Sequence, residues 1–318
     1  MRKEAPPPQF RGAGFGARPE DAASSARTNS SPAPRNWAGG AALAVTTSVR
    51  PDPALEAQAR AIAAELSAPF LPRTGLSVAD VFTASDAARL LIAGADHLRL
   101  RDRATGAEYF FHPNLFQVRA ANVLRGAPDH FLEATELTPG DSLLDCTLGF
   151  ASEASLAALA VGETGQVTGL ESVPELALVT RLGVQQFELH SGALTQALRR
   201  VQVVTADSAE YLPLCASGSV DVVYFDPFFE HRLSGSEVSV SPLFVFGNPA
   251  PLQAETVAEA RRVARRRVVI KHPRDEPLPE RVQIWVTATL SSRKRRVVYS
   301  VLDTTPKTHA SFGPSRVQ

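Results

Sequence analysis

Residues 143–153 read Leu143-Leu-Asp-Cys-Thr-Leu-Gly-Phe-Ala-Ser-Glu153 and lead into an alanine-rich stretch. An apolar run that ends in an acid, a glycine turn and a helix start is the order of a β-strand joined to an α-helix. Such a turn lets a ligand approach the backbone at the carboxyl edge of a sheet. It has one glycine, Gly149, where dinucleotide-binding loops have three, which favours a smaller nucleoside-like ligand over a pyrophosphate. A capped strand–helix turn without a ligand is the alternative interpretation.

The same order of strand and helix recurs along the rest of the chain. Strand-like apolar runs lie at 142–146, 167–170, 201–204, 220–225 and 267–270, and helical patterns lie between them at 153–160, 174–182, 193–198, 209–214 and 252–263. This alternation with continuous apolar strands predicts an α/β fold with a doubly wound, mostly parallel sheet. The last two runs, 282–290 and 296–302, have no helix between them and predict an antiparallel hairpin that closes the sheet.

The amino-terminal third differs in composition. Residues 1–44 are rich in Pro, Ala, Ser, Gly and Arg and show no apolar periodicity, which predicts a disordered tail. Residues 45–113 predict a small α+β subdomain, with a helix that begins at Pro53 after the N-cap Asp52 and a hairpin from 97–100 and 108–112. Residues 114–318 then form the larger α/β domain.

Composition restricts the class of protein. The chain has 318 residues, of which 44% are hydrophobic and 21% charged, as in ordinary globular proteins. It has no run of about 18 apolar residues that would span a membrane. Two cysteines are too few for a disulfide framework, which favours a reduced, cytoplasmic setting. No spacing of histidine and cysteine predicts a metal site.

Charge is balanced overall but not locally. The chain has 33 basic and 33 acidic residues, so its net charge indicates no partner. Residues 259–300 contain twelve arginines and lysines against four acids. Such a basic cluster suits contacts with phosphates. Solvated faces on either side of a strand are the alternative interpretation.

Two more acids stand at predicted strand ends. Glu171 ends the second strand, 22 residues after Gly149, where a carboxylate could accept both hydroxyls of a ribose. Asp207 follows the third strand and could accept from an adenine amino group. Each could instead cap the helix that follows it.

The fourth strand ends in the run Asp221-Val-Val-Tyr-Phe-Asp-Pro-Phe-Phe-Glu-His-Arg232. The Asp226 carboxylate can accept hydrogen bonds from an exocyclic NH2 group. Pro227 forces the chain out of the strand, and Phe228 and Phe229 offer rings for stacking on a flat base. By itself this run also fits an ordinary turn, because Asp-Pro is common in turns.

Taken together, these strand ends resemble class I S-adenosylmethionine-dependent methyltransferases over residues 140–302. That Rossmann-like fold ends with an antiparallel strand beside the parallel ones. The runs at 145–153, 223–232 and 268–274 are similar to bacterial 16S rRNA guanine-N2 methyltransferases, which have Asp-Pro-aromatic-Pro-His-Arg and Val-Lys-Arg-Pro patterns at the second and third places. The chain departs from these patterns at Phe229, Glu230 and His272. The resemblance therefore supports the fold and the cofactor of this family more strongly than it supports the substrate.

The resemblance implies S-adenosylmethionine as cofactor and methyl transfer to an exocyclic amine of a nucleobase in RNA, with guanine N2 in rRNA or the small ribosomal subunit preferred. The implied cofactor-binding residues are Asp145, Thr147, Gly149, Glu171, Ser172, Asp207, Ser208 and Asp226. The implied catalytic residues are Asp226, Pro227, Phe228 and Phe229, and the implied substrate-binding residues are His231, Arg232, Lys271 and Arg274.

Other functions remain open on the sequence. A methyltransferase of this class could act on DNA, tRNA, a protein or a small molecule, because a flat amine does not name the polymer. A non-catalytic RNA-binding protein on a degenerate methyltransferase fold is a second alternative. A nicotinamide-dependent oxidoreductase is disfavoured by the single glycine of the first loop.

Overall fold

The computed structural model describes residues 41–228, 242–291 and 296–304, which form two compact units. The first unit contains residues 41–112, 174–195 and 242–246. The second unit contains the other described residues, beginning at Pro113. Two later helices, α6 (Pro174–Gln186) and α9 (Pro242–Phe246), belong with the amino-terminal residues in this division. The subdomain of residues 45–113 remains a prediction from the sequence.

The first unit is built on a four-stranded sheet in the order β1-β2-β3-β4, in which β1 is parallel to β2 and the other pairs are antiparallel. The strands are β1 (Ala41–Thr47), β2 (Ala87–Ala93), β3 (Leu98–Asp102) and β4 (Glu108–Tyr109). Strand β1 begins three residues before the predicted end of the tail, so its first four residues lie within the predicted tail. Pairing of Ala41 with Ala87 orders this backbone, and composition does not reveal such long-range pairing.

Helices α1 (Pro53–Glu65) and α2 (Val78–Ser85) pack on β1 and β2. As predicted, Asp52 caps α1, and its carboxylate accepts the N–H of Leu55 at 2.7 Å. Helices α6 and α9 contact β3 and β4. There the buried Tyr109 hydroxyl lies 2.8 Å from the Thr180 hydroxyl.

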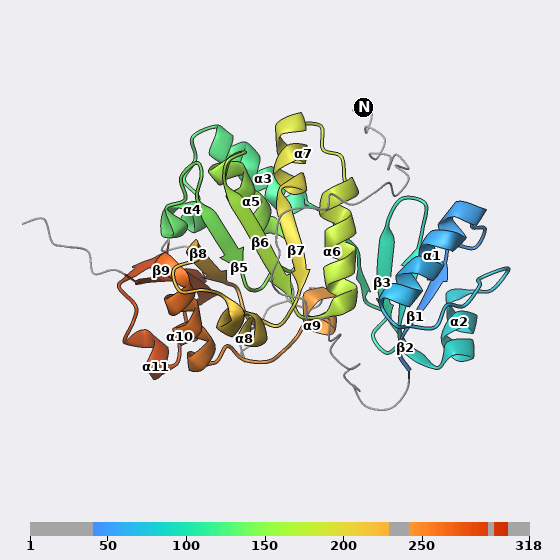
Figure 1. The fold of residues 1–318 in the computed structure, drawn as a ribbon. Coiled ribbons are helices and arrows are strands. Elements are labelled where there is room, and N and C mark those ends of the chain that lie inside the picture. Colours follow the sequence, from blue (N-terminus) through green and yellow to red (C-terminus); the bar gives the residue numbers. More distant parts are fainter. Residues whose placement is uncertain (1–40, 229–241, 292–295, 305–318) are drawn as a thin grey trace, which may run out of the picture. The chain divides into compact units, whose positions relative to one another are not determined.

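The second unit is built on a seven-stranded sheet in the order β10-β11-β9-β8-β5-β6-β7 (Figure 1). In this order, the five strands from β9 to β7 are parallel to one another. Strand β11 is antiparallel to β9, and β10 is antiparallel to β11. The prediction of a doubly wound, mostly parallel sheet with an antiparallel end is confirmed. The strands are β5 (Ser142–Asp145), β6 (Gln166–Glu171), β7 (Val201–Thr205), β8 (Val220–Phe225), β9 (Ala264–Pro273), β10 (Ala288–Leu290) and β11 (Val297–Asp303).

Helices cover both faces of this sheet. Alternate side chains of a strand point to opposite faces, so Tyr224 of β8 meets Phe131 of α4, while Val223 joins a cluster with Val257 of α10. One face is covered by α3 (Asn114–Leu124), α4 (His130–Thr135) and α5 (Ser152–Val161). The other is covered by α8 (Ser208–Tyr211), the 3-10 helix Leu212–Leu214, α10 (Ala254–Val263) and α11 (Glu280–Gln283). Helix α7 (Gly192–Arg199) precedes β7.

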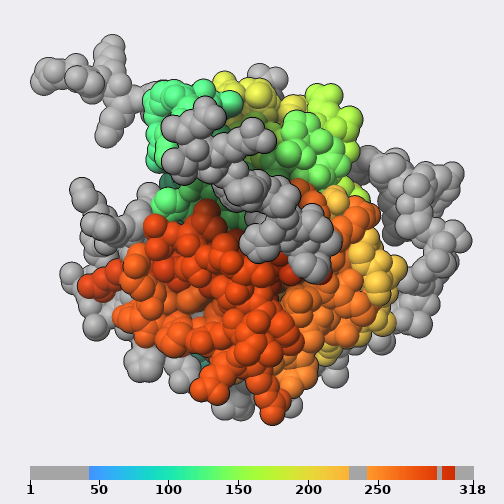
Figure 2. Space-filling model, turned by 90° about the vertical axis from the view of Figure 1, so that its left-hand side faces the viewer, coloured from blue at the N-terminus to red at the C-terminus, as the bar shows by residue number. Residues whose placement is uncertain are grey.

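The carboxyl-terminal hairpin is shorter than predicted. The sequence predicted a strand over 282–290, but the chain forms α11 first and only 288–290 pair with β11. Pro279 stands at the start of α11, and one turn of helix buries Val282 in the core beside Leu278. The segments from α10 to β11 form the orange to red surface in Figure 2. Within the described residues, no helix has the length and apolar character needed to cross a bilayer.

The strand order places the functional edge of the sheet. Strand β5 lies between β6, which follows it in the chain, and β8, so the order of connections reverses at β5. In open α/β sheets, ligands bind outside the carboxyl ends of the strands at this switch point. Those ends belong to β5 and β8, the strands that carry Asp145 and Asp226.

Candidate active site

Three strands bring ionisable side chains to the switch point. Asp145 ends β5, Asp226 directly follows β8, and Lys271 lies near the end of β9. The Lys271 Nζ donates to Asp226 Oδ2 at 2.6 Å. The sequence predicted Lys271 as a substrate contact, and the structure brings it directly against the predicted catalytic acid.

The ion pair continues into a chain of alternating charges. Lys271 Nζ lies 3.4 Å from Oε1 of Glu153, in the first turn of α5. The same oxygen accepts from Arg119 of α3 at 2.8 Å, and Arg119 makes two further bonds of 2.9 Å to Asp129. Burial disfavours the ionised form of Glu153, but Lys271 and Arg119 outweigh it and lower the pKa of Glu153 to about 2. The order is therefore Asp226, Lys271, Glu153, Arg119 and Asp129, each next to an opposite charge.

The Asp226 side chain is partly exposed to solvent and partly surrounded by the chain. Its side chain is 35% exposed, so a ligand can reach it, while the surrounding chain removes much of its solvation. Burial raises the pKa of Asp226, Lys271 opposes that shift, and the nearby Glu153 adds to it. The carboxylate is thus held in place by a cation and is more basic than a free aspartate.

Thr147 joins the two strand ends. Its hydroxyl accepts the backbone N–H of Asp226 at 2.6 Å, and its own N–H donates to Asp145 Oδ1 at 3.0 Å. Asp145 is only 1% exposed, and this burial raises its pKa to about 8. A group with a pKa of about 8 is mostly protonated at neutral pH, so the acid that ends β5 is neutral in the chain alone.

Replacing Asp145 with asparagine is expected to change how stability depends on pH. The raised pKa means that unfolding releases a proton from Asp145, so its contribution to stability is full below about pH 4 and is lost as pH rises toward 8. Asp145→Asn removes this loss, and we expect it to be roughly 1–3 kcal/mol more stable relative to wild type at pH 8 than at pH 4.5. Urea unfolding at the two pH values measures the difference, and an equal effect of the substitution at both would contradict it.

The loop after β5 is folded tightly. Gly149 and Ala151 have φ values of 50° and 56°, in the left-handed region that an alanine rarely adopts. The N–H of Leu148 donates to the carbonyl of Leu170 at 2.9 Å, which brings the loop over β6. A Cβ at Gly169 would lie 2.3 Å from Cδ1 of Leu148, so any side chain there would displace Leu148 from its present position on the strand.

Glu171 and Asp207 lie at the same edge, because β6 and β7 continue the parallel sheet beside β5. Glu171 is 9% exposed and accepts the N–H of Val173 at 3.0 Å. Asp207 is the N-cap of α8 and accepts the N–H of Ala209 at 2.9 Å. Ser172 directly follows Glu171, and Ser208 directly follows Asp207. The helix-capping interpretation of Asp207 is thus confirmed. Oδ1 of Asp207 caps the helix, and Oδ2 lies at the strand end, 3.4 Å from Asn248 Nδ2.

The structure describes only some of the remaining predicted residues. Phe228 is half-buried just after Pro227, whereas Phe229, His231 and Arg232 lie outside the described residues. Arg274 is exposed and its guanidinium donates to Ser291 at 2.9 Å. Sequence reasoning missed Glu153, Arg119 and Asp129 as parts of the site. The position of Glu153 in the first turn after the glycine loop was the available signal, but nothing in the spacing pairs it with Lys271.

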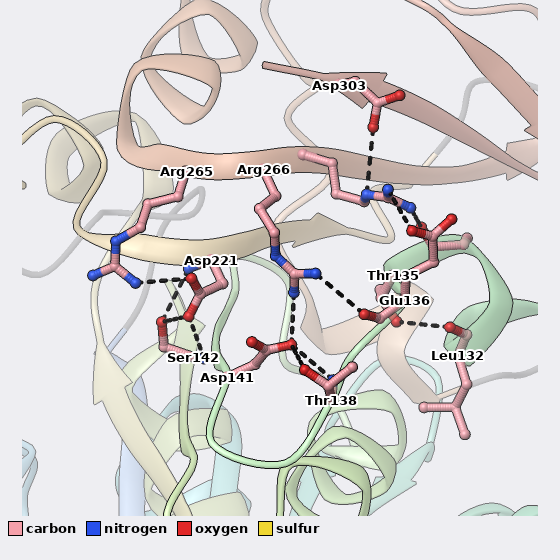
Figure 3. Close-up of polar contacts among 12 residues, drawn as sticks. Leu132, Thr135, Glu136, Thr138, Asp141, Ser142, Asp221, Arg265, Arg266 and Asp303 are labelled. Carbon is pink, nitrogen blue, oxygen red and sulfur yellow. Dashed lines mark hydrogen bonds and ion pairs between the residues drawn. The ribbon is translucent and has the colours of Figure 1, made fainter. Parts of the chain in front are cut away.

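The basic cluster predicted for phosphate contacts is divided by the fold. Figure 3 shows Arg265 and Arg266 bonded to Asp221 at 2.8 Å and Asp141 at 2.6 Å. Arg267 is 6% exposed and binds the Ala134 carbonyl and Glu136. These arginines begin β9, which is parallel to β8, so they lie at the opposite end of the sheet from Asp226. They join strands and helices within the second unit, which favours a structural role over contact with a ligand at the active site.

A seven-stranded sheet of this order, with acids at the ends of β5, β6, β7 and β8, defines a class I methyltransferase. A family model described as "Putative SAM-dependent methyltransferase" matches residues 79–300, and the chain belongs to this family. It is therefore an S-adenosylmethionine-dependent methyltransferase with S-adenosylmethionine as its cofactor. The set of residues fits that group, since Glu171 and Asp207 supply acceptors for hydroxyl and amino groups and the Gly149 loop brings backbone close to the same edge.

Two relatives and one solved structure are similar to this chain. "Uncharacterized protein YpiP" of Bacillus subtilis is 35% identical over 262 residues, covering 82% of this chain and 100% of that protein. Ribosomal RNA small subunit methyltransferase J of Thioalkalivibrio sulfidiphilus is 34% identical over 148 residues, covering 44% of this chain and 55% of the relative. The SAM-dependent methyltransferase NGO1261 from Neisseria gonorrhoeae has the same fold, with a TM-score of 0.56 and 19% identity over 82% of this chain and 96% of that one.

Proposed function

We propose that the enzyme methylates an exocyclic amine of a nucleobase in RNA, with guanine N2 of small-subunit rRNA as the preferred acceptor. The observation that carries this proposal is the position of Asp226, Pro227 and Phe228 at the switch point, with Lys271 2.6 Å from the Asp226 carboxylate. The relative from Thioalkalivibrio sulfidiphilus is named as a ribosomal RNA methyltransferase, which supports an rRNA substrate. Its match covers 44% of this chain and 55% of the relative. The cytoplasm, where ribosomes are made in bacteria, is the matching location.

Asp226 orients the acceptor. The lone pair of a guanine amine is delocalised into the ring, so the amine is a poor nucleophile until its hydrogens are held out of the ring plane. The exposed part of the Asp226 carboxylate accepts one of these hydrogens, while Lys271 holds the other part. Phe228 stacks on the base, an interaction worth about 1–3 kcal/mol. The base has to leave its stack in the RNA to reach this edge of the sheet.

The proton balance also assigns a role to Asp226. S-adenosylmethionine supplies an electrophilic methyl group, whose bond to sulfur breaks as the electron pair returns to the sulfur. The amine nitrogen forms the new bond to the methyl carbon and then carries one proton too many. Asp226 takes that proton, which its raised pKa favours. Lys271 remains protonated, because Glu153 and Asp226 raise its pKa above the usual value in spite of its burial.

The cofactor lies across the ends of β5, β6 and β7 in this proposal. Glu171 and Ser172 hold the ribose, and Asp207 and Ser208 hold the adenine. Asp145, Thr147 and Gly149 shape the methionine end, next to Asp226. A cation at that end of the cofactor would favour the ionised form of Asp145, whose burial otherwise keeps it neutral. Phe229, His231, Arg232 and Arg274 are proposed contacts of the acceptor RNA.

Nucleoside mapping of rRNA tests the substrate. We expect rRNA from a strain that lacks this gene to have lost one N2-methylguanosine, because the proposed acceptor is the N2 amine of a guanine in small-subunit rRNA. Mass spectrometry of digested rRNA measures the modification. The wild-type gene should restore the nucleoside on a plasmid, whereas the Asp226→Ala gene should not. An rRNA profile unchanged by the deletion would reject the rRNA substrate and leave the methyltransferase class intact.

A further inference from the structure

On one face of the sheet in the first unit, the described residues cover β1 and β2 with a helix, while the side chains of β3 are partly exposed. Helix α2 packs on β1 and β2, over Leu90 and Ile92. Residues that pair across an antiparallel sheet point to the same side, and Leu90 and Ile92 pair with Arg101 and Arg99. These two arginines of β3 therefore lie on the same face as α2, and each is only partly buried.

Aromatic rings lie beside the arginines. Strand β4 pairs Glu108 with Arg101, and continuing that register by two residues places Phe110 across from Arg99. Phe110 is 37% exposed, and its ring centroid lies 5.3 Å from that of His97 and 5.4 Å from that of His112. Three rings thus follow one another along the edge of the sheet, next to the charged row of β3.

Arg73 adds a third positive charge near Arg99 and Arg101. Burial lowers the pKa of Arg73, and the positive charges of Arg99 and Arg101 lower it further, so the three guanidinium groups lie near one another. Arg101 has Glu108 as an ion-pair partner at 3.2 Å. Among the described residues, neither Arg73 nor Arg99 pairs with an acid, although Asp96 lies near His97 at the start of β3. Like charges that outnumber the acids around them repel one another in the chain alone and favour an anionic partner.

We propose that Arg73, Arg99, Arg101 and the rings of His97, Phe110 and His112 form a binding surface for single-stranded RNA. Guanidinium groups bind phosphates, and exposed rings stack on unpaired bases, so the combination suits RNA better than a purely acidic protein. This arginine–aromatic surface shares no residue with the acceptor site, because all its residues belong to the first unit and Asp226 belongs to the second. The inference rests on the proposed function in that it takes RNA as the substrate, and it adds a second contact by which the enzyme holds that RNA.

Salt-dependent RNA binding tests the proposal. We expect the variant with Arg73→Ala and Arg99→Ala to bind a labelled single-stranded oligoribonucleotide about tenfold more weakly and to lower the slope of log Kd against log salt by about 1.4, since each phosphate contact contributes about 0.7. The matched control changes Arg60 and Arg181 to alanine, which removes the same charge from the first unit at exposed ion pairs with Glu56 and Glu65. It should retain the wild-type slope. Fluorescence anisotropy on the full chain at several salt concentrations provides both quantities.

A ring substitution separates stacking from charge. Phe110→Ala is expected to weaken binding by about tenfold without changing the salt slope, because stacking releases no counterions. Calorimetry with S-adenosylmethionine should give the wild-type Kd for every variant, since the surface lies outside the cofactor site. If the arginine variant keeps the wild-type affinity and slope, the surface does not bind RNA, while the proposed function stands. If the wild-type protein binds no RNA even at low salt, both proposals fail, and a protein partner becomes the better assignment for this surface.

Discussion

Replacing Asp226 with alanine is expected to reduce methyl transfer by about a thousandfold while S-adenosylmethionine binding stays within a few-fold of wild type. The substitution removes both the acceptor that orients the amine and the base that takes its proton, and such positioned groups contribute about 10²–10⁴-fold. The cofactor loses little, because its other contacts lie at β5, β6 and β7. Single-turnover transfer to RNA and calorimetry with the cofactor measure the two effects.

Two further variants make this experiment specific. Asp275→Ala removes an exposed acid four residues beyond Lys271 and should change neither transfer nor cofactor binding. Asp226→Asn keeps the shape but cannot take a proton, so it should retain the cofactor and remain at least a hundredfold slower than wild type. Parallel loss of transfer and cofactor binding in Asp226→Ala would show that Asp226 is structural, and the catalytic proposal would then be withdrawn.

Replacing Glu153 with glutamine is expected to lower the free energy of unfolding by about 3 kcal/mol at pH 7, since it leaves Lys271 and Arg119 buried without their shared partner. The pKa of Glu153 is lowered to about 2, so its contribution to stability is full above about pH 4.5 and is lost as pH falls toward 2. Wild type and variant should therefore approach one another in stability as the solution is acidified. Urea unfolding at pH 7 and pH 3 measures both.

The same substitution at an exposed pair is the control. Glu255 lies 3.8 Å from Arg281, and both side chains are more than three-quarters exposed. Glu255→Gln is expected to change the free energy of unfolding by at most about 0.5 kcal/mol, because exposed ion pairs contribute little. A Glu153→Gln protein that is as stable as Glu255→Gln at pH 7 would mean that the charge chain from Asp226 to Asp129 does not hold the site together.

The strands and their terminal acids could be read from the sequence because their causes are local. A continuous apolar run predicts a buried parallel strand, and the residue after it must lie at the carboxyl edge of the sheet. Asp145, Glu171, Asp207 and Asp226 were found in this way. The cap at Asp52 is also local, since it depends on a carboxylate three residues before an N–H.

Other features depend on residues that are distant in the chain. Lys271 follows Asp226 by 45 residues and Glu153 by 118, and only the strand order β5-β8-β9 brings them within bonding distance. The roles of the arginines at the start of β9 also depend on residues that are distant in the chain. Their number suggested a phosphate surface, but partners from Ala134 to Asp303 hold them at the opposite end of the sheet.

The sequence by itself therefore determined the class of fold, the cofactor and the acid of the proposed acceptor site, because each depends on a short run of residues. Tertiary structure alone decided that Lys271 holds Asp226 and that Arg99 and Arg101 share one face of a separate sheet, with Arg73 near them. The physical reason is that strand order and register set which charges become neighbours. Electrostatic interactions depend on distance in space and on burial, and neither follows from spacing along the chain.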